Sequence, residues 1–177
     1  MTQAVGFLKR AASVAASGYR QLVRVLEWLI PVFDLSVRLY LAHIFWTGGM
    51  VKLSSWISTV MLFTMVYDVP LLPPEIAAYL ATAIELGGSF LLAIGLAGRW
   101  AALALFGLNI VASTSYGQLS EAALQESFYW GILFLYFVLH GPGLLSIDAL
   151  LRYLYRRRHV MSSPNEAVSK QIVLRNV

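Results

Sequence analysis

The chain has 177 residues, of which 59% are apolar and only 12% are charged, whereas a soluble domain carries about 25% charged residues. This composition predicts a single compact integral membrane domain. The chain contains no cysteine, which excludes disulfides, thiol relays, iron–sulfur clusters and thiolate metal sites within this polypeptide. No metal site is expected, and the formal net charge of +4 does not by itself predict a nucleic-acid partner.

Residues 1–33 are expected to form an amphipathic cytoplasmic leader. Basic residues such as Arg20 and Arg24 alternate with apolar residues such as Leu22. This pattern favours a helix that lies in the membrane interface, with its basic side chains toward anionic head groups. A mobile basic leader is the alternative. Pro31 is expected to end the helix before the first span, because a proline in a helix interior removes a hydrogen bond.

The first predicted membrane span covers Asp34–Val51. Asp34 and Arg38 are spaced i, i+4 and can pair along one helix face, while Arg38 can equally anchor the helix at the membrane edge. The apolar piece Ile57–Val66 that follows is too short to cross the bilayer, since a spanning helix needs roughly 20 residues. It is therefore expected to be interfacial or re-entrant.

The second predicted span, Ile76–Leu96, carries Glu85 near its middle. An ionised carboxylate costs about 2.5–3.5 kcal/mol at the centre of a bilayer, so it has to face the bundle, take a proton or find a partner. Small residues on a helix allow another helix to approach closely. The predicted helix-packing glycines are Gly49, Gly87, Gly88 and Gly95.

Two further spans complete the predicted domain. The third, Ala101–Ser115, contains Asn109, and the fourth, Ser127–Leu145, is rich in aromatic residues and contains His140. Residues 34–150 are thus expected to form an all-α membrane four-helix bundle, to which the leader adds an N-terminal interfacial amphipathic helix.

Basic residues predict the orientation of the chain in a bacterial inner membrane, because loops on the cytoplasmic side are enriched in Lys and Arg. They collect in the leader, at Arg99 and in the cluster Arg152–Arg158, whereas the other side carries only Lys52 beside acidic residues. Both termini are therefore expected in the cytoplasm. Residues 151–177 are expected to be a basic, disordered tail.

Each predicted span contributes a polar residue to the bundle. The intramembrane polar candidates are Arg38, His43, Glu85, Asn109 and His140. A structural hydrogen bond is the favoured interpretation for Asn109, both interpretations stay open for the histidines, and a function is favoured for Glu85. We expect Glu85 to be held by a basic partner from the first span, either His43, because of its depth, or Arg38, because of its reach.

These motifs together resemble the DoxX family. They are Arg38…Gly49…Lys52-Leu53 in the first span, Glu85-Leu-Gly-Gly…Gly95-Leu…Arg99 in the second, and Glu126 and Gly141-Pro-Gly-Leu-Leu-Ser-Ile-Asp148 at the ends of the fourth. The resemblance covers residues of about 34–150. It implies a four-helix bacterial inner-membrane protein; namesakes of the family are small subunits of a thiosulfate:quinone oxidoreductase, and some relatives join membrane-associated oxidoreductase complexes.

Three functions are compatible with this pattern, and no catalytic residue is assigned. The first is an accessory subunit of a redox system that binds a quinone or anchors an oxidoreductase partner, with Glu85 and a histidine as proton carriers beside aromatic residues. The second is a small proton-coupled transporter in which Glu85 and Arg38 alternate partners. The third is a non-catalytic membrane assembly factor. The expected partners are the lipid bilayer, an oxidoreductase subunit and further copies of the chain.

Overall fold

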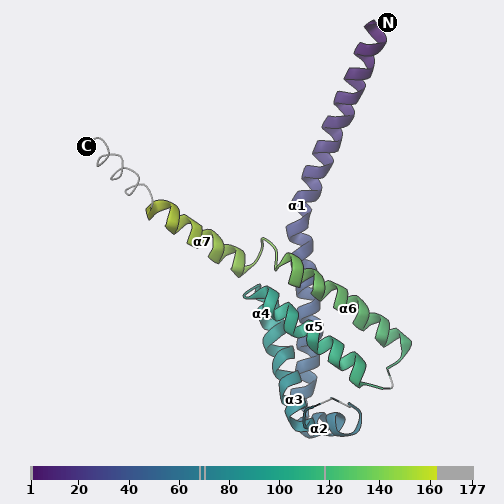
Figure 1. The fold of residues 1–177 in the computed structure, drawn as a ribbon, viewed down its shortest axis with the longest axis vertical. Coiled ribbons are helices and arrows are strands. Elements are labelled where there is room, and N and C mark those ends of the chain that lie inside the picture. Colours follow the sequence, from purple (N-terminus) through teal and green to yellow (C-terminus); the bar gives the residue numbers. More distant parts are fainter. Residues whose placement is uncertain (1, 68, 70, 118, 163–177) are drawn as a thin grey trace, which may run out of the picture.

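The computed structural model of the protein describes residues 2–67, 69, 71–117 and 119–162. It is all-helical, with 86% helix and no strand in that part of the chain. Figure 1 shows a group of packed helices from which the N-terminal half of α1 and the C-terminal helix α7 project. The predicted all-α fold class is therefore confirmed.

Helix α1 (Thr2–Ser54) is one continuous helix that includes both the predicted leader and the first span. Pro31 lies inside it, so the predicted break at this residue is wrong. Proline has no N–H and leaves the carbonyl of Glu27 without its helical partner, but helices of membrane proteins tolerate such a gap locally. The short apolar helix α2 (Trp56–Met65) follows. The interfacial position of the leader stays a prediction.

Helices α3 (Pro74–Ala83), η1 (Ile84–Gly88) and α4 (Ser89–Ile94) follow one another without interruption and make up the second predicted span. The first is an α-helix, the second a single π-helical turn and the third a short α-helix. Pro74 begins the series, at a position where its missing N–H would have no helical partner in any case.

Helices α5 (Gly98–Ser115) and α6 (Glu121–His140) lie side by side, as Figure 1 shows, and α7 (Ile147–Ser162) leaves the group after a loop. The expected disorder of the tail is wrong for residues 151–162. Apolar residues recur there at helical spacing, which favours an amphipathic helix. Residues 163–177 lie outside the described part of the chain.

Two segments of the described chain are long and apolar enough to cross a membrane, Pro74–Ile94 and Glu121–His140. Only 33% and 17% of their most apolar windows are buried inside the protein. An apolar core helix of a soluble protein would be mostly buried, so this exposure indicates that the outer faces contact lipid. The first and third predicted spans are helical as well, within α1 and α5, but polar residues lower their hydropathy, and the four-span bundle stays a prediction.

Apolar side chains from α1, α4, α5 and α6 fill the interior of the helix group. The buried cluster consists of Leu41, Phe45, Leu92, Ala101, Ala102, Leu105, Phe134 and Phe137. Phe45 makes edge-on contacts with Trp130 and Phe134, at ring-centroid separations of 5.8 and 4.9 Å. In lipid, where the surroundings are as apolar as the interior, helices are held together by such close packing and by hydrogen bonds between them.

The loop after α6 is fastened to the turn between α4 and α5. The carboxylate of Asp148 accepts hydrogen bonds from the backbone N–H groups of Ala97 and Gly98, both at 2.9 Å. The Asp148 N–H donates in turn to the Gly95 carbonyl at 3.0 Å. Gly95 has a φ of 68°, a left-handed conformation that favours glycine at the end of a helix. The start of α7 is thereby fixed against the end of the second span.

Three of the four predicted packing glycines lie at close contacts. A Cβ added at Gly49, Gly88 or Gly95 would come within 3.0 Å of a neighbouring side chain. A Cβ added at Gly87 would meet no heavy atom within 4 Å. The expected packing contact is therefore absent at Gly87, because this position faces away from the neighbouring helices.

Replacing Gly88 with leucine should lower the free energy of unfolding by about 1–3 kcal/mol, the usual cost of overpacking. The added Cβ would lie 3.0 Å from Cγ of Leu105 on α5, so the two helices would have to separate. Thermal melting of the purified protein in detergent measures the effect. Gly87→Leu is the matched control and should melt near the wild-type temperature. Equal melting of both variants would contradict the packing described here.

Candidate functional site

A cavity of about 280 Å³ lies beside η1, between α1, α5 and α6. Aromatic and aliphatic side chains form much of its wall: Ile44, Phe45, Leu108, Leu119 and Trp130. The polar residues that line it are Tyr67, Glu85, Asn109, Ser113 and Ser127. An apolar cavity with a few converging polar groups is the usual form of a small-molecule binding site.

The π-helical turn η1 places Glu85 at this cavity. In a π turn the backbone hydrogen bonds join residues five apart, so one residue is inserted into the α-helical repeat. The hydroxyl of Ser89 donates to the carbonyl of Glu85 and, at 3.2 Å, to that of Leu86, which satisfies carbonyls of the widened turn. Single π turns inside α-helices occur frequently at functional sites.

Lys52 holds the carboxylate of Glu85. The Lys52 ammonium lies 2.6 and 2.7 Å from the two carboxylate oxygens, and the side chains are only 17% and 12% exposed. In a medium of low dielectric constant such a pair is stable only if the two charged groups lie within hydrogen-bond distance, because each charge has lost its hydration. A lysine that bonds to both oxygens meets this requirement.

The predicted partner of Glu85, Arg38 or His43, is wrong, although the predicted helix is right. Lys52 stands in the last turn of α1, directly after the predicted first span. Its long aliphatic stem lets the ammonium reach back along the helix toward the carboxylate. The pair Gly48-Gly49, one turn before Lys52, is a sequence signal for a close helix contact but does not identify the side chain that bonds to Glu85.

The glycines of α1 bring the two helices into contact at this pair. A Cβ on Gly49 would lie 2.7 Å from Cδ2 of Leu86, and a Cβ on Gly48 would lie 3.6 Å from Oε1 of Glu85. Any larger side chain at Gly49 would therefore push α1 away from η1. Close approach of the backbones is what small residues provide in membrane helices.

Tyr67, in the connection between α2 and α3, lies at the mouth of the cavity. Its ring stacks on Phe63 at 4.9 Å and meets Tyr116 at 5.4 Å, and its backbone forms an isolated bridge with Tyr116. Burial, together with the negative charge of Glu85, raises the pKa of the Tyr67 phenol above its usual range. The phenol therefore stays neutral and able to donate a hydrogen bond.

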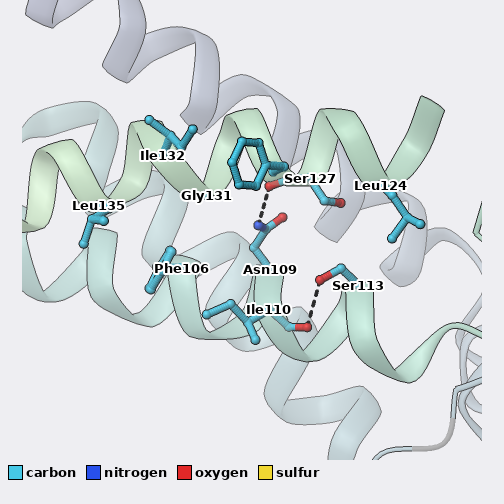
Figure 2. A pocket seen from close by; sticks show the side chains of 10 residues that line it. Phe106, Asn109, Ile110, Ser113, Leu124, Ser127, Gly131, Ile132 and Leu135 are labelled. Carbon is cyan, nitrogen blue, oxygen red and sulfur yellow. Dashed lines mark hydrogen bonds between the residues drawn. The ribbon is translucent and has the colours of Figure 1, made fainter. Parts of the chain in front are cut away.

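Asn109 separates the cavity from a second hollow of about 400 Å³ on the outer side of α5 and α6. Figure 2 shows its amide donating to the carbonyl of Ser127, at 2.8 Å, among apolar side chains. Asn109, Ser113 and Ser127 line both spaces. The rest of the outer hollow is largely apolar, with Phe106, Ile110, Leu124, Phe128, Ile132 and Leu135.

Arg38 belongs to a separate polar cluster at the other end of the helix group. Its guanidinium is 2% exposed and donates to the backbone carbonyls of Pro142 and, at 2.6 Å, Leu145. The neighbouring buried carboxylate of Asp34 accepts a hydrogen bond from Tyr136 at 2.8 Å. The Arg38 bonds fasten the loop after α6 to α1, and the Asp34 bond fastens α6 itself to α1. Asp34 and Arg38, spaced i, i+4, thus hold the end of α6 and the loop that follows it.

The two histidines lie apart from Glu85. The side chain of His43 faces outward on α1. His140 stacks on Tyr136, with ring centroids 5.0 Å apart, and its Nε2 lies 4.0 Å from a carboxylate oxygen of Asp34. Of the five polar candidates, the structure brings only Glu85 and Asn109 together at one cavity.

The fold and the cavity define a helical membrane-type protein with an ion pair between two of its helices. The family model described as DoxX matches residues 33–116, which confirms the resemblance to the DoxX family, a membrane-associated family. The match includes Lys52, Glu85 and Asn109, and it ends before α6. No curated protein and no solved structure matches the chain.

Removing either partner of the ion pair should destabilise the protein more than removing both. Lys52→Met and Glu85→Gln should each cost about 2 kcal/mol, because a hydrogen bond to a charged group is lost and its partner is left unsatisfied. The double variant should cost less than either single variant, and thermal melting in detergent gives the coupling. His43→Leu, on the outward face of α1, is the control. Strict additivity would mean that the two charges do not interact.

Proposed function

We propose that the protein is an inner-membrane accessory subunit of a redox system and that its cavity takes the head group of a quinone. The observation that carries this proposal is the pair of neighbouring spaces that share Asn109, Ser113 and Ser127 in their walls. One contains Glu85 with its lysine, and the other is an apolar groove open to the outside of α5 and α6. A molecule with a flat polar head and a long apolar tail has the complementary shape.

The side chains at the cavity suit such a head group. Phe45 and Trp130 offer aromatic surfaces against which a flat ring can pack. Asn109 and Tyr67 carry polar hydrogens near the same space, and carbonyl oxygens accept hydrogen bonds from such groups. The apolar tail would lie along the groove between α5 and α6, where lipid also has access.

The Lys52–Glu85 pair would handle protons at this site. A quinone takes up two electrons and two protons when it is reduced, and the electrons would come from an oxidoreductase partner subunit. Glu85 lines the cavity and can accept or release a proton there, while Lys52 stabilises its charged form. Both lie near Tyr67, in the connection at one end of the helix group, from which the carboxylate could exchange protons with water.

A proton-coupled transporter fits the arrangement less well. The Lys52–Glu85 pair and the cluster around Arg38 are separated along α1 by the apolar cluster that contains Leu41, Phe45 and Phe134. In the described part of the chain, Glu85 and Arg38 lie on opposite sides of this apolar layer. For the two side chains to exchange partners, one of them would have to move through it. If the cavity binds no quinone, the remaining alternative is that the protein is a non-catalytic membrane assembly factor.

Quinone binding is tested by titrating the full chain, in lipid nanodiscs, with a short-chain ubiquinone by isothermal titration calorimetry. Trp130→Leu should weaken binding about tenfold, because loss of an aromatic contact costs about 1.4 kcal/mol. Trp100→Leu is the matched control, since Trp100 is 73% exposed and lies outside the cavity. No saturable binding by the wild type would refute the proposal.

The proposed orientation has both termini in the cytoplasm of a bacterium. The basic residues near α7 and at Arg99 favour this side. A fluorescent reporter that matures only in the cytoplasm should be bright when fused after Val177 and dark when inserted at Leu72, in the connection before α3. A periplasmic phosphatase fused at the same places should give the opposite pattern. A bright reporter at Leu72 would reverse the orientation.

A further inference from the structure

We propose that α7 is an amphipathic anchor that lies on an anionic lipid leaflet, at the end of the helix group where α4 meets α5. This inference does not depend on quinone binding. It rests on three properties of α7: an apolar stripe, an arginine face and a fixed starting point at the membrane boundary.

One face of α7 is apolar and uncovered. Ile147, Leu150, Leu151 and Leu154 are spaced i, i+3, i+4 and i+7, so they form one stripe along the helix. Leu150, Leu151 and Leu154 are each 45% to 55% exposed. Figure 1 shows α7 projecting away from the other described helices, which agrees with the half-exposed state of these leucines.

The opposite face of α7 is basic. Arg152 and Arg156 are spaced i, i+4 and lie opposite the apolar stripe, whereas Arg157, at i+7 from Leu150 and i+3 from Leu154, borders the stripe. The acidic residue of the described helix, Asp148, is already bonded to the backbone of Ala97 and Gly98. A basic face opposite an apolar stripe is typical of helices that lie in the head-group region of an anionic membrane.

The start of α7 fixes it at the height of the membrane boundary. The bonds of Asp148 join it to the turn that directly follows the candidate span Pro74–Ile94. The exposed Trp100 and the basic Arg99 stand next to this turn, and such residues are enriched where membrane helices end. From this point α7 runs at an angle to α1 (Figure 1), so it can lie along the surface.

The charge selects lipid over a second copy of the chain as the occupant of the stripe. A second α7 packed on the stripe would place the Arg157 side chains, which border the stripe, at the edge of the interface, where juxtaposed like charges repel. An anionic leaflet offers hydrocarbon to the leucines and phosphates to the arginines at once. Because α7 begins next to the end of a span, it can lie on the lipid surface without any further movement of the chain.

Because the chain contains no cysteine, single cysteines can carry spin labels along α7 in the otherwise native protein. The full chain is reconstituted in vesicles of phosphatidylcholine with phosphatidylglycerol, and collisions with oxygen and with a water-soluble nickel complex are measured. Labels at Leu150→Cys and Leu154→Cys should collide more often with oxygen than with the nickel complex. Labels at Ala149→Cys and Arg156→Cys should collide more often with the nickel complex. Equal nickel access at all four positions would overturn the proposal, and so would leucine positions shielded from both reagents, which would mean a protein cover.

The contribution of the arginines is tested in the Leu150→Cys and Leu154→Cys backgrounds. Exchanging Arg152, Arg156 and Arg157 for glutamine should reduce the oxygen preference at both positions, and so should vesicles of phosphatidylcholine alone or high salt. The melting temperature should stay at the wild-type value, since these side chains lie outside the packed core. An oxygen preference that is unchanged in all three conditions would show that charge does not hold α7 on the membrane and would overturn the anionic anchor.

Discussion

The ion pair between Lys52 and Glu85 is the constraint on which the rest of the site depends. A carboxylate in the middle of an apolar span is costly unless a positive group lies close to it. Lys52 supplies this group from α1, and the two helices can approach this closely because Gly49 has no side chain. The π turn then directs the same carboxylate to the edge of a cavity rather than into a sealed interface.

The polar groups of the described chain fall into two layers with different tasks. The layer around Glu85 and Asn109 borders empty space and is lined by aromatic side chains. The layer around Arg38 and Asp34 is bonded to α6 and to the loop after it, and so holds these parts of the chain against α1. The apolar cluster between them separates a layer suited to binding from a layer that holds the architecture.

Much of this arrangement could be predicted from residue types and spacing. The second span, the central place of Glu85, the close contacts at Gly49, Gly88 and Gly95 and the family resemblance all follow from local patterns. The partner of Glu85 could not be predicted, because the π turn rotates the helix face and the reach of Lys52 depends on how α1 and η1 cross. Neither the π turn nor the crossing leaves a clear periodic signal.

The errors in the helix ends have similar causes. Pro31 is disfavoured in a helix interior, yet α1 continues through it, so the local cost is offset along a long helix. The high charge of residues 151–177 predicts a disordered tail, whereas the leucines of α7 recur at helical spacing, which favours a helix. His43 faces outward because of the rotation of α1 about its axis. The depth of a residue along a single helix does not predict this rotation.

The most direct measurement of the central claim is a solid-state NMR distance between the Lys52 ammonium nitrogen and the Glu85 carboxyl carbon, in the full chain in lipid bilayers. Selective ¹⁵N-lysine and ¹³C-glutamate labelling should give strong dipolar dephasing, as expected for Nζ at 2.6 and 2.7 Å from the two carboxylate oxygens. The dephasing should vanish in Lys52→Met. Its absence in the wild-type protein would contradict the account.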